Sequence, residues 1–300
     1  MAATLTTANV VARAKINLAL HVVGRRDDGY HLLDSIVVFA HLHGASADGG
    51  TGDDCGDKLS IAFDEGHTAE PELTVSGPFA EEVPHGRGNS ALEAALAVGS
   101  IASIHLEKHL PVAVGVGGGS ADAAAVLRAA ASQGGHHPSR YGEVALRLGA
   151  DVPVCLDETP ARMGGIGETL SSIHCPSLAA VLVNPGVAVA TPPVFANLES
   201  RENPPLPPWP NPVDAQSVAR WLDSTRNDLE PPAIAFAPPI ASALGALRSF
   251  NGCLLARMSG SGATVFGLFC DLQASREAAS VIAREQPGWW VRPASLAPQS

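Results

Sequence analysis

The feature that most constrains this chain is a glycine cluster at residues 115–119, where four of the five residues are glycine. Such density costs backbone entropy on folding, so the chain must need conformations or close approaches that a Cβ atom forbids. An alanine-rich segment follows at once, and we predict a helix there from about Ser120 to Gln133. The free N–H groups and positive dipole end of a helix start favour anions, so the cluster predicts a phosphate-binding loop.

Two other glycine loops do not fit this sequence. The P-loop pattern requires Gly-Lys-Ser/Thr, and no lysine follows the cluster. The dinucleotide pattern GxGxxG fails because Ser120 stands where its last glycine belongs. A tight turn without a ligand stays open as the structural alternative.

Composition limits the class of protein. The chain has 19 basic and 30 acidic residues and a formal net charge of −11, which argues against non-specific binding of nucleic acid. Its five cysteines form no CxxC pair, and no histidine pattern indicates a metal site. No signal peptide or uninterrupted apolar span is visible, so we expect a cytoplasmic protein without a membrane segment.

Strands and helices are mixed without strict alternation, which predicts an α+β protein of two domains, residues 1–160 and 161–300. Alternating apolar residues predict strands through most of the first forty residues. A long helix is expected over Ser90–Leu106, with Ser90 as its N-cap and Glu93 completing a capping box. Another is expected over Arg140–Leu148, ending at a left-handed Gly149.

The other predicted elements complete this pattern. Residues 48–57 are expected to form a solvated loop, and the proline-rich residues 203–212 to lack regular structure. Further strands are expected at Lys58–Phe63, Glu72–Val75, Ala179–Val183, Cys253–Met258, Thr264–Phe269 and Trp289–Arg292, and further helices at Asp214–Ser224, Pro239–Arg248 and Leu272–Glu285.

Two charged residues lie in apolar segments outside the glycine cluster. Lys15 is flanked by apolar residues, where an ammonium is expensive to bury without an anionic partner. Asp151 separates the helix that ends near Leu148 from an expected apolar strand at residues 152–154. Pairing the two would keep the carboxylate ionised and able to accept a hydroxyl proton. A surface lysine and an ordinary turn aspartate are the alternatives, since spacing alone does not show that they meet.

Three segments together resemble the three signature motifs of the GHMP kinase superfamily. They are Ala14–Leu18, Pro111–Ala125 and Met258–Phe266, in the superfamily's order and at matching separations. The resemblance extends from about Ala14 to Phe269. It implies an N-terminal domain like domain 2 of ribosomal protein S5 and a ferredoxin-like C-terminal domain, with ATP as the phosphoryl donor.

Two further segments point to one branch of the superfamily. Residues 24–32 resemble a G-x-R-x-D-G-Y-H motif and residues 148–153 an L-G-A-D-V-P motif, both typical of kinases whose alcohol substrate carries a cytidine diphosphate group. The activity implied is ATP-dependent phosphorylation of the 2-hydroxyl of diphosphocytidyl-methylerythritol in the non-mevalonate route to isoprenoid precursors. The partner implied is that small molecule, and oligomeric state is not indicated.

The resemblance also assigns residues. It places the catalytic pair at Lys15 and Asp151, and an active-site glycine turn at Gly260, Ser261 and Gly262. Mg²⁺ is expected with ATP, and Ser120 is its one candidate ligand. The substrate-binding residues implied are Asn17, Tyr30, His31, Thr191 and Phe195, with the two aromatic rings stacking on cytosine. The ATP-binding residues implied are Asn89, Lys108, Pro111, Gly115, Val116, Gly117, Gly118, Gly119 and Ser120.

Alternatives remain at the level of sequence. Without the resemblance, Tyr30, His31 and Phe195 would be ordinary core residues. The chain departs from the usual motifs at Val116, where leucine is common, and at Ser90, where an apolar residue is common. A GHMP kinase for another alcohol, such as homoserine or mevalonate, would share the loop and Lys15. A non-catalytic nucleotide-binding protein on the same fold is less consistent with the presence of both Lys15 and Asp151.

Overall fold

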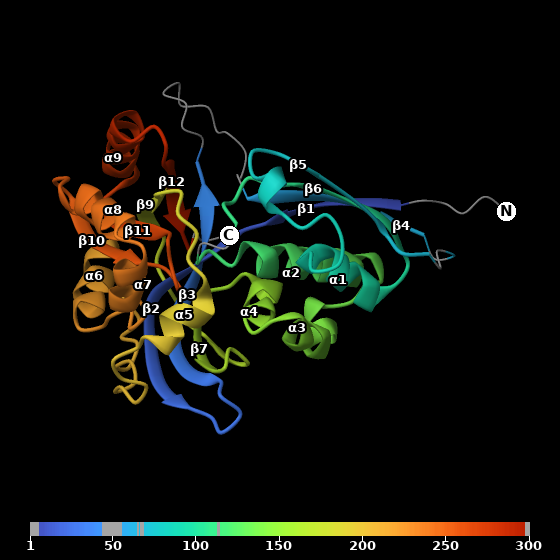
Figure 1. Ribbon diagram of the computed structural model, residues 1–300, viewed down its shortest axis with the longest axis horizontal. Helices are drawn as coiled ribbons and strands as arrows, with labels where there is room; N and C mark the ends of the chain where they lie inside the picture. The colour runs from blue at the N-terminus through green and yellow to red at the C-terminus, as the bar shows by residue number, and fades with distance from the viewer. Residues whose placement is uncertain (1–5, 44–55, 65, 67–68, 113–114, 298–300) are drawn as a thin grey trace. The chain divides into compact units, whose positions relative to one another are not determined.

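The computed structural model describes residues 6–43, 56–64, 66, 69–112 and 115–297 (Figure 1). Its chain forms two compact units. Unit 1 comprises residues 1–14, 56–112 and 117–158, and unit 2 comprises residues 15–55, 113–116 and 159–300. A change of unit at residues 158–159 lies close to the expected boundary at 160. Residues 15–43 and 115–116 nevertheless belong with the C-terminal part, which no sequence pattern indicated.

Unit 1 is a four-stranded sheet with helices on one of its faces (Figure 1). The strand order is β1-β4-β6-β5, and only the β5–β6 pair is parallel. Helix α2 is buried along most of its length, because its alanine side chains let neighbouring elements approach closely. The elements are β1 (Thr6–Ala12), β4 (Asp57–Phe63), β5 (Glu72–Ser76), β6 (Ile101–Glu107), α1 (Ser90–Val98), α2 (Gly118–Gln133), α3 (Gly142–Leu148) and α4 (Val152–Asp157), with two short 3₁₀ turns at Ala80–Glu82 and Pro138–Tyr141.

The long helix expected over Ser90–Leu106 is wrong in its second half. Helix α1 ends at Val98, and the next two residues have positive φ angles, 71° at Gly99 and 57° at Ser100. Residues 101–107 then form β6, the strand between β4 and β5. The expected cap is also wrong: the Asn89 side-chain oxygen, and not Ser90, accepts from the N–H groups of Ala91 and Leu92.

Two expectations near Asp151 are corrected as well. Gly149 follows α3 as expected, but its φ of 165° is extended and not left-handed. The apolar residues after Asp151 form helix α4, where a strand was expected. Pro153 suits the first turn of a helix because its missing N–H would have no acceptor there.

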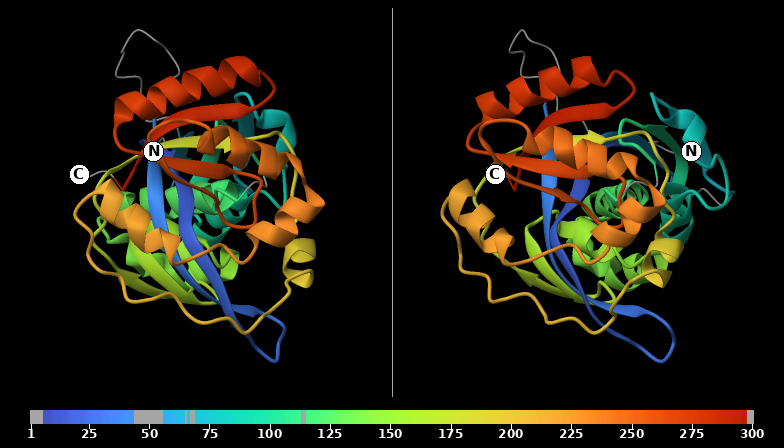
Figure 2. Two further views of the ribbon diagram at one scale, coloured as in Figure 1. Left: turned by 90° about the vertical axis from the view of Figure 1, so that its left-hand side faces the viewer. Right: turned by 60° about the vertical axis from the view of Figure 1, so that its left-hand side comes forward.

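Unit 2 is built on an eight-stranded sheet in the order β10-β11-β9-β12-β3-β7-β8, with β2 paired to β3. The short strands β7 and β8 were not expected, whereas the other predicted strands and helices after residue 170 are confirmed within a few residues. Figure 2 shows α9 running along β12. The elements are β2 (Ala14–Arg25), β3 (His31–Leu42), β7 (Ala161–Gly165), β8 (Thr169–Ser172), β9 (Leu178–Asn184), β10 (Cys253–Met258), β11 (Val265–Phe269), β12 (Trp290–Leu296), α5 (Thr191–Ala196), α6 (Ala215–Asp223), α7 (Glu230–Phe236), α8 (Pro239–Arg248) and α9 (Leu272–Glu285).

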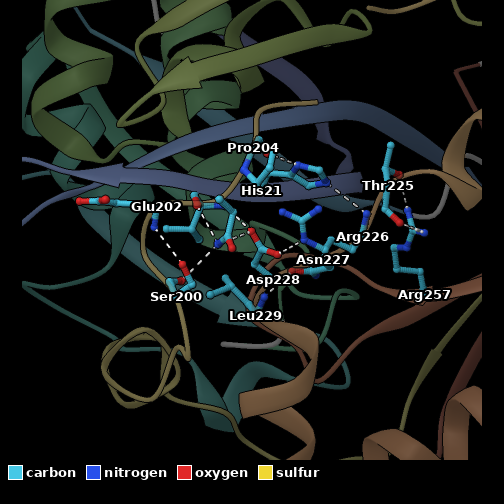
Figure 3. A network of polar contacts seen from close by, with 12 residues as sticks. His21, Ser200, Glu202, Pro204, Thr225, Arg226, Asn227, Asp228, Leu229 and Arg257 are labelled. Carbon is cyan, nitrogen blue, oxygen red and sulfur yellow. Dashed lines mark hydrogen bonds and ion pairs between the residues drawn. The ribbon is translucent and has the colours of Figure 1, made fainter. Parts of the chain in front are cut away.

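The proline-rich residues 203–212 contain no helix or strand, as expected, yet polar contacts hold them to β2. The His21 ring contacts the Pro204 carbonyl through Nδ1 at 2.9 Å and accepts from the Arg226 N–H through Nε2 at 3.2 Å (Figure 3). Asp228 accepts from the Val22 N–H and from Asn203. Because a carbonyl can only accept and an N–H can only donate, these contacts fix His21 as a neutral ring protonated at Nδ1.

Candidate active site

The glycine turn and the first part of the glycine cluster contact each other within unit 2. The Ser259 hydroxyl donates to the Gly115 carbonyl at 3.0 Å. Gly115 has a φ of 77°, and a Cβ atom there would lie 2.3 Å from the Ser259 carbonyl oxygen. Gly260 is also constrained, since it has a φ of 56° and its Cβ would lie 2.9 Å from the Gly115 oxygen. Two motifs separated by more than 140 residues are therefore in backbone-to-backbone contact, which only glycine permits.

The first motif joins the same place through β2. The Lys15 N–H donates to the Val116 carbonyl at 3.0 Å, and the Asn17 N–H donates to the Ser259 hydroxyl at 3.1 Å. Lys15 and Asn17 are two residues apart on a strand, so their side chains leave the same face. Both are buried, at 3% and 1% exposure. In unit 2 the structure thus brings together parts of all three motifs.

The residues expected to bind cytosine lie in unit 2 as well. The rings of His31 and Phe195 are stacked, with centroids 4.7 Å apart and planes at 30°. Tyr30 is 59% exposed at the turn before β3, so it is not a core residue. Thr191 shares a 2.8 Å hydrogen bond with Ser261 of the glycine turn.

His31 carries a further mark of a binding site. Its Nε2 atom is buried and has no hydrogen-bond partner among the described residues. Burial lowers the pKa of His31, and the nearby Arg25 and Arg201 lower it further. The ring is therefore neutral near pH 7, with one nitrogen available to a ligand.

Unit 1 holds the second part of the glycine cluster, at the start of α2. Gly117 has a φ of 64° and precedes the helix, whose first backbone bond runs from the Ala121 N–H to the Gly117 carbonyl. The N–H groups of residues 118–120 consequently have no acceptor within the helix. Gly119 is exposed, and Gly118 and Ser120 are partly exposed. This is the geometry that binds phosphate oxygens. Ser120 lies inside the helix and does not cap it.

Lys108 is buried beneath this helix start and does not face solvent. Its Nζ atom lies 2.5 Å from Asp57 Oδ2 and 2.6 Å from Asp122 Oδ2, and the side chain is 2% exposed. A Cβ atom on Gly118 would lie 3.2 Å from the same Nζ. We therefore assign Lys108 to the support of the loop, because contact with adenine or ribose through this ammonium would require breaking the ion pairs.

The two carboxylates of this cluster were missed by the sequence analysis. Asp57 was placed in a solvated loop, of which residues 48–55 lie outside the described part, but it is fully buried and accepts from the N–H groups of His109 and Leu110. Asp122 is a charged residue within an otherwise apolar stretch of α2, which could have signalled it. Burial raises the pKa of Asp122 to about 8; the nearby Lys108 lowers it, and the charge of Asp57 raises it further.

The remaining candidates are placed as follows. Asn89 caps α1 and also donates to the Pro84 carbonyl, and the Ser90 hydroxyl lies 3.1 Å from a Cβ built on Gly119. The N-termini of α1 and α2 are therefore adjacent. Pro111 is buried in the core. Asp151 precedes α4 in unit 1, whereas Lys15 belongs to unit 2, so the pairing of these two residues stays a prediction.

Known proteins resemble this chain over nearly its full length. Residues 80–158 match the N-terminal domain family of GHMP kinases, and residues 214–287 match the C-terminal family. The chain is 51% identical over 296 residues to a 4-diphosphocytidyl-2-C-methyl-D-erythritol kinase of Cereibacter sphaeroides, covering 95% of this chain and 98% of the relative. It is 50% identical to the kinase of the same name from Paracoccus denitrificans, with 96% of each chain covered.

Solved structures give the same result. A crystal structure of a 4-(cytidine 5'-diphospho)-2C-methyl-D-erythritol kinase superposes with a TM-score of 0.70 at 31% identity, covering 96% of this chain and 99% of that one. A homoserine kinase of Cytophaga hutchinsonii superposes with a TM-score of 0.62 at 16% identity, which is a likeness of fold alone. Within the described residues, none of the helices is both long and apolar enough to span a membrane.

Proposed function

Since this chain belongs to the 4-diphosphocytidyl-2-C-methyl-D-erythritol kinase family of GHMP kinases, we propose that it transfers the γ-phosphoryl group of ATP to the 2-hydroxyl of that diphosphocytidyl alcohol. One observation in the structure supports this most strongly. Parts of the three motif segments, carrying Lys15, Gly115 and Ser259, are in direct contact within unit 2. The reaction belongs to the non-mevalonate route to isoprenoid precursors, and we expect it to take place in the cytoplasm.

In the proposed reaction, the start of α2 holds the phosphates of ATP. The N–H groups of residues 118–120 are open to phosphate oxygens, and the helix dipole favours the negative charge. The Lys108 ammonium lies below this point, paired with Asp57 and Asp122, and supports the loop. Asn89, at the adjacent start of α1, is proposed to lie near the adenine.

Lys15 and Asp151 are the proposed catalytic pair. Phosphoryl transfer needs an in-line hydroxyl and charge stabilisation of the transferred group, and asks little covalent work of the protein. The Lys15 ammonium would stabilise the developing charge, and the Asp151 carboxylate would orient the hydroxyl and accept its proton. Asn17, on the same face of β2 as Lys15, is proposed to bind the alcohol.

The cytosine site is proposed around Phe195 and Tyr30. The Phe195 ring, which stacks on His31 here, would offer its face to the base, and the exposed Tyr30 would cover the other side. His31 would read the edge of the base through the unpartnered Nε2. Thr191 would support this site through its bond to Ser261.

Mg²⁺ is expected to enter with ATP. No group of three or more His, Cys, Asp or Glu side chains suited to a metal ion occurs among the described residues. This fits an ion held mainly by phosphate oxygens and water, as Mg²⁺ prefers, with the Ser120 hydroxyl as the proposed protein ligand. Bound there, the ion would neutralise charge on the phosphates.

A coupled assay of ADP release tests the proposal. The purified protein is offered the diphosphocytidyl alcohol, homoserine or mevalonate with ATP, and we expect turnover only with the first. Asp151→Asn and Lys15→Met should each lower kcat by about 10²–10⁴-fold. A protein that binds ATP but turns over none of the alcohols would support the non-catalytic alternative. Equal turnover of homoserine or mevalonate would point to another GHMP kinase.

The cytosine site has a separate test. Tyr30→Ala combined with Phe195→Ala should raise the KM for the diphosphocytidyl alcohol and leave the KM for ATP within about twofold, because only the base loses its stacking partners. Trp209→Ala, in the proline-rich segment of the same unit, is the control and should change neither KM. An unchanged KM for the alcohol in the double variant would remove Tyr30 and Phe195 from the site.

A further inference from the structure

The side chain of Asn17 has one satisfied end and one unsatisfied end. Its Nδ2 donates to the Ser35 hydroxyl at 2.8 Å. Its Oδ1 is buried and has no hydrogen-bond partner among the described residues. A buried acceptor without a donor is unfavourable, so an arrangement that keeps one needs an explanation.

Ser35 determines which end of the amide is left open. Its hydroxyl, in β3, is fully buried and donates to the Ala19 carbonyl at 2.7 Å. A hydroxyl has a single proton, and a carbonyl can only accept. With that proton directed at Ala19, the Ser35 oxygen can only accept, so the end of Asn17 that faces it must be the NH₂ group. Rotating the amide by 180° would place two acceptors against each other.

The open oxygen is therefore an acceptor in a fixed orientation. It lies on the face of β2 that also carries Lys15, the proposed catalytic ammonium. A ligand that satisfies it must bring a donor, and an alcohol hydroxyl is one, whereas a phosphate oxygen is not. The acceptor end thus suits the alcohol and disfavours the phosphates of ATP.

We propose that Ser35 is a positioning residue that holds the Asn17 amide with Oδ1 directed at a hydroxyl of the alcohol substrate. This role rests on the proposed function, because the alcohol is the substrate assigned there. Ser35 does not touch the substrate, and it acts only through Asn17. In its absence the amide is free to rotate and to present an NH₂ group to the hydroxyl.

The test is steady-state kinetics of Ser35→Ala with both substrates. We expect kcat/KM for the diphosphocytidyl alcohol to fall about ten- to hundredfold. This is the range seen when a hydrogen bond that orients a metal-binding side chain is removed, and Ser35 orients Asn17 in the same way. The KM for ATP should stay within about twofold. Ser35→Thr keeps the hydroxyl and should recover most of the activity. Ser275→Ala is the matched control, since Ser275 is also fully buried and donates to a carbonyl, that of Leu272.

A double-mutant cycle separates this role from loss of stability. If Ser35 acts through Asn17, the double variant Asn17→Ala/Ser35→Ala should be no worse than Asn17→Ala alone. Additive losses, or a Ser35→Ala variant with the kinetics of the wild type, would overturn the inference. If instead the wild-type protein does not phosphorylate the alcohol, the proposed function fails first, so the two failures are distinguishable.

Discussion

Lys108 of unit 1 and Arg257 of unit 2 are both buried cations, and the two units accommodate them in different ways. In unit 1, Lys108 lies between the carboxylates of Asp57 and Asp122. In unit 2, Arg257 donates only to uncharged oxygens, the carbonyls of Leu18, Leu222 and Thr225 and the Thr225 hydroxyl. No carboxylate among the described residues lies within the ion-pair distance of 4.0 Å from Arg257.

The chemistry of the two cations explains the difference. An ammonium is a compact charge, and its removal from water is offset only by nearby opposite charge. Burial opposes that charge, but the attraction of Asp122 and Asp57 dominates and raises the pKa of Lys108. A guanidinium spreads its charge over five N–H groups, so several carbonyls can solvate it. Burial still lowers the pKa of Arg257, to about 10, but the group stays charged at neutral pH.

Each cation also supports part of the proposed site. The ion cluster of unit 1 joins both ends of the glycine cluster, since Asp57 binds the N–H groups before Pro111 and Asp122 lies on α2. Arg257 joins β10 to β2 and to the end of α6, one residue before Met258 and the glycine turn. The comparison predicts that loss of the charge-paired cation has the larger effect.

The largest effect is expected for Lys108→Met. This change leaves the buried Asp57 carboxylate and its neighbour Asp122 without their cation, and we expect the free energy of unfolding to fall by about 3–5 kcal/mol. The KM for ATP should rise, because the loop above Lys108 loses its support. Chemical denaturation and ATP titration measure the two effects. Lys58→Met, at a half-buried position on the same strand, β4, as Asp57, is the control and should cost about 1 kcal/mol or less.

A smaller effect is expected for Arg257→Met. The carbonyls of Leu18, Leu222 and Thr225 lose a donor, but no opposite charge is left behind, so we expect a loss of about 2–3 kcal/mol. Arg257→Lys should recover part of this, since an ammonium can bond to some of the same oxygens. Denaturation curves for the three proteins decide the order. A loss larger than that of Lys108→Met would contradict the distinction between the two cations.

Asp122→Asn tests whether the folded protein keeps a proton on Asp122. The pKa of about 8 lies above the usual value near 4, so the folded protein keeps a proton there that the unfolded chain has released. Between pH 4 and 8 this group therefore lowers stability as pH rises, by at most about 1.4 kcal/mol per pH unit. Asparagine resembles the protonated acid, so the variant should cost about 1 kcal/mol or less at pH 7 and should lose this slope.

Denaturation at several pH values between 5 and 9 measures that slope. The wild type should lose stability relative to Asp122→Asn as the pH rises. Parallel curves for the two proteins would mean that Asp122 is ionised throughout, and that Lys108 satisfies both carboxylates equally.

Local sequence patterns predicted part of the fold correctly and missed another part. Helix α9 and strands β9, β10 and β11 follow from local periodicity, because nothing distant opposes it. The end of α1 at Val98 was missed although local signals exist, since Gly99 is typical of a helix end and the β-branched Ile101 and Ile104 favour a strand. Pairing with β4 and β5 then makes residues 101–107 a strand.

The candidate site was likewise predictable from the sequence only in part. The three motifs indicated where their segments would meet, because each is marked by residues that ordinary packing does not need. The ion cluster of Lys108 could not be predicted, since Asp57, Lys108 and Asp122 are far apart in sequence and the partners of a buried charge are set by the fold. Asp57 in particular follows a run of Gly and Asp that indicated a solvated loop.

The smallest effect is expected at His21, which like Arg257 is buried and bonds to uncharged groups, in this case backbone groups only (Figure 3). Burial lowers the pKa of His21, which means that the folded protein holds the neutral ring. The unfolded chain gains a proton below about pH 6.5 and the folded protein does not, so stability is fully present above pH 6.5 and is lost as the pH falls. The loss ends at the folded pKa of His21, which burial places below its usual value.

His21→Gln tests this assignment, because an amide can make both backbone bonds but cannot titrate. We expect wild-type protein to lose stability between pH 7 and pH 5 by at most about 1.4 kcal/mol per pH unit from this group, and His21→Gln to lack that part of the loss. His174→Gln, whose side chain is exposed in the same unit, should behave as the wild type. If His21→Gln keeps the full acid sensitivity, backbone partners do not hold the ring neutral, and the parallel with Arg257 fails.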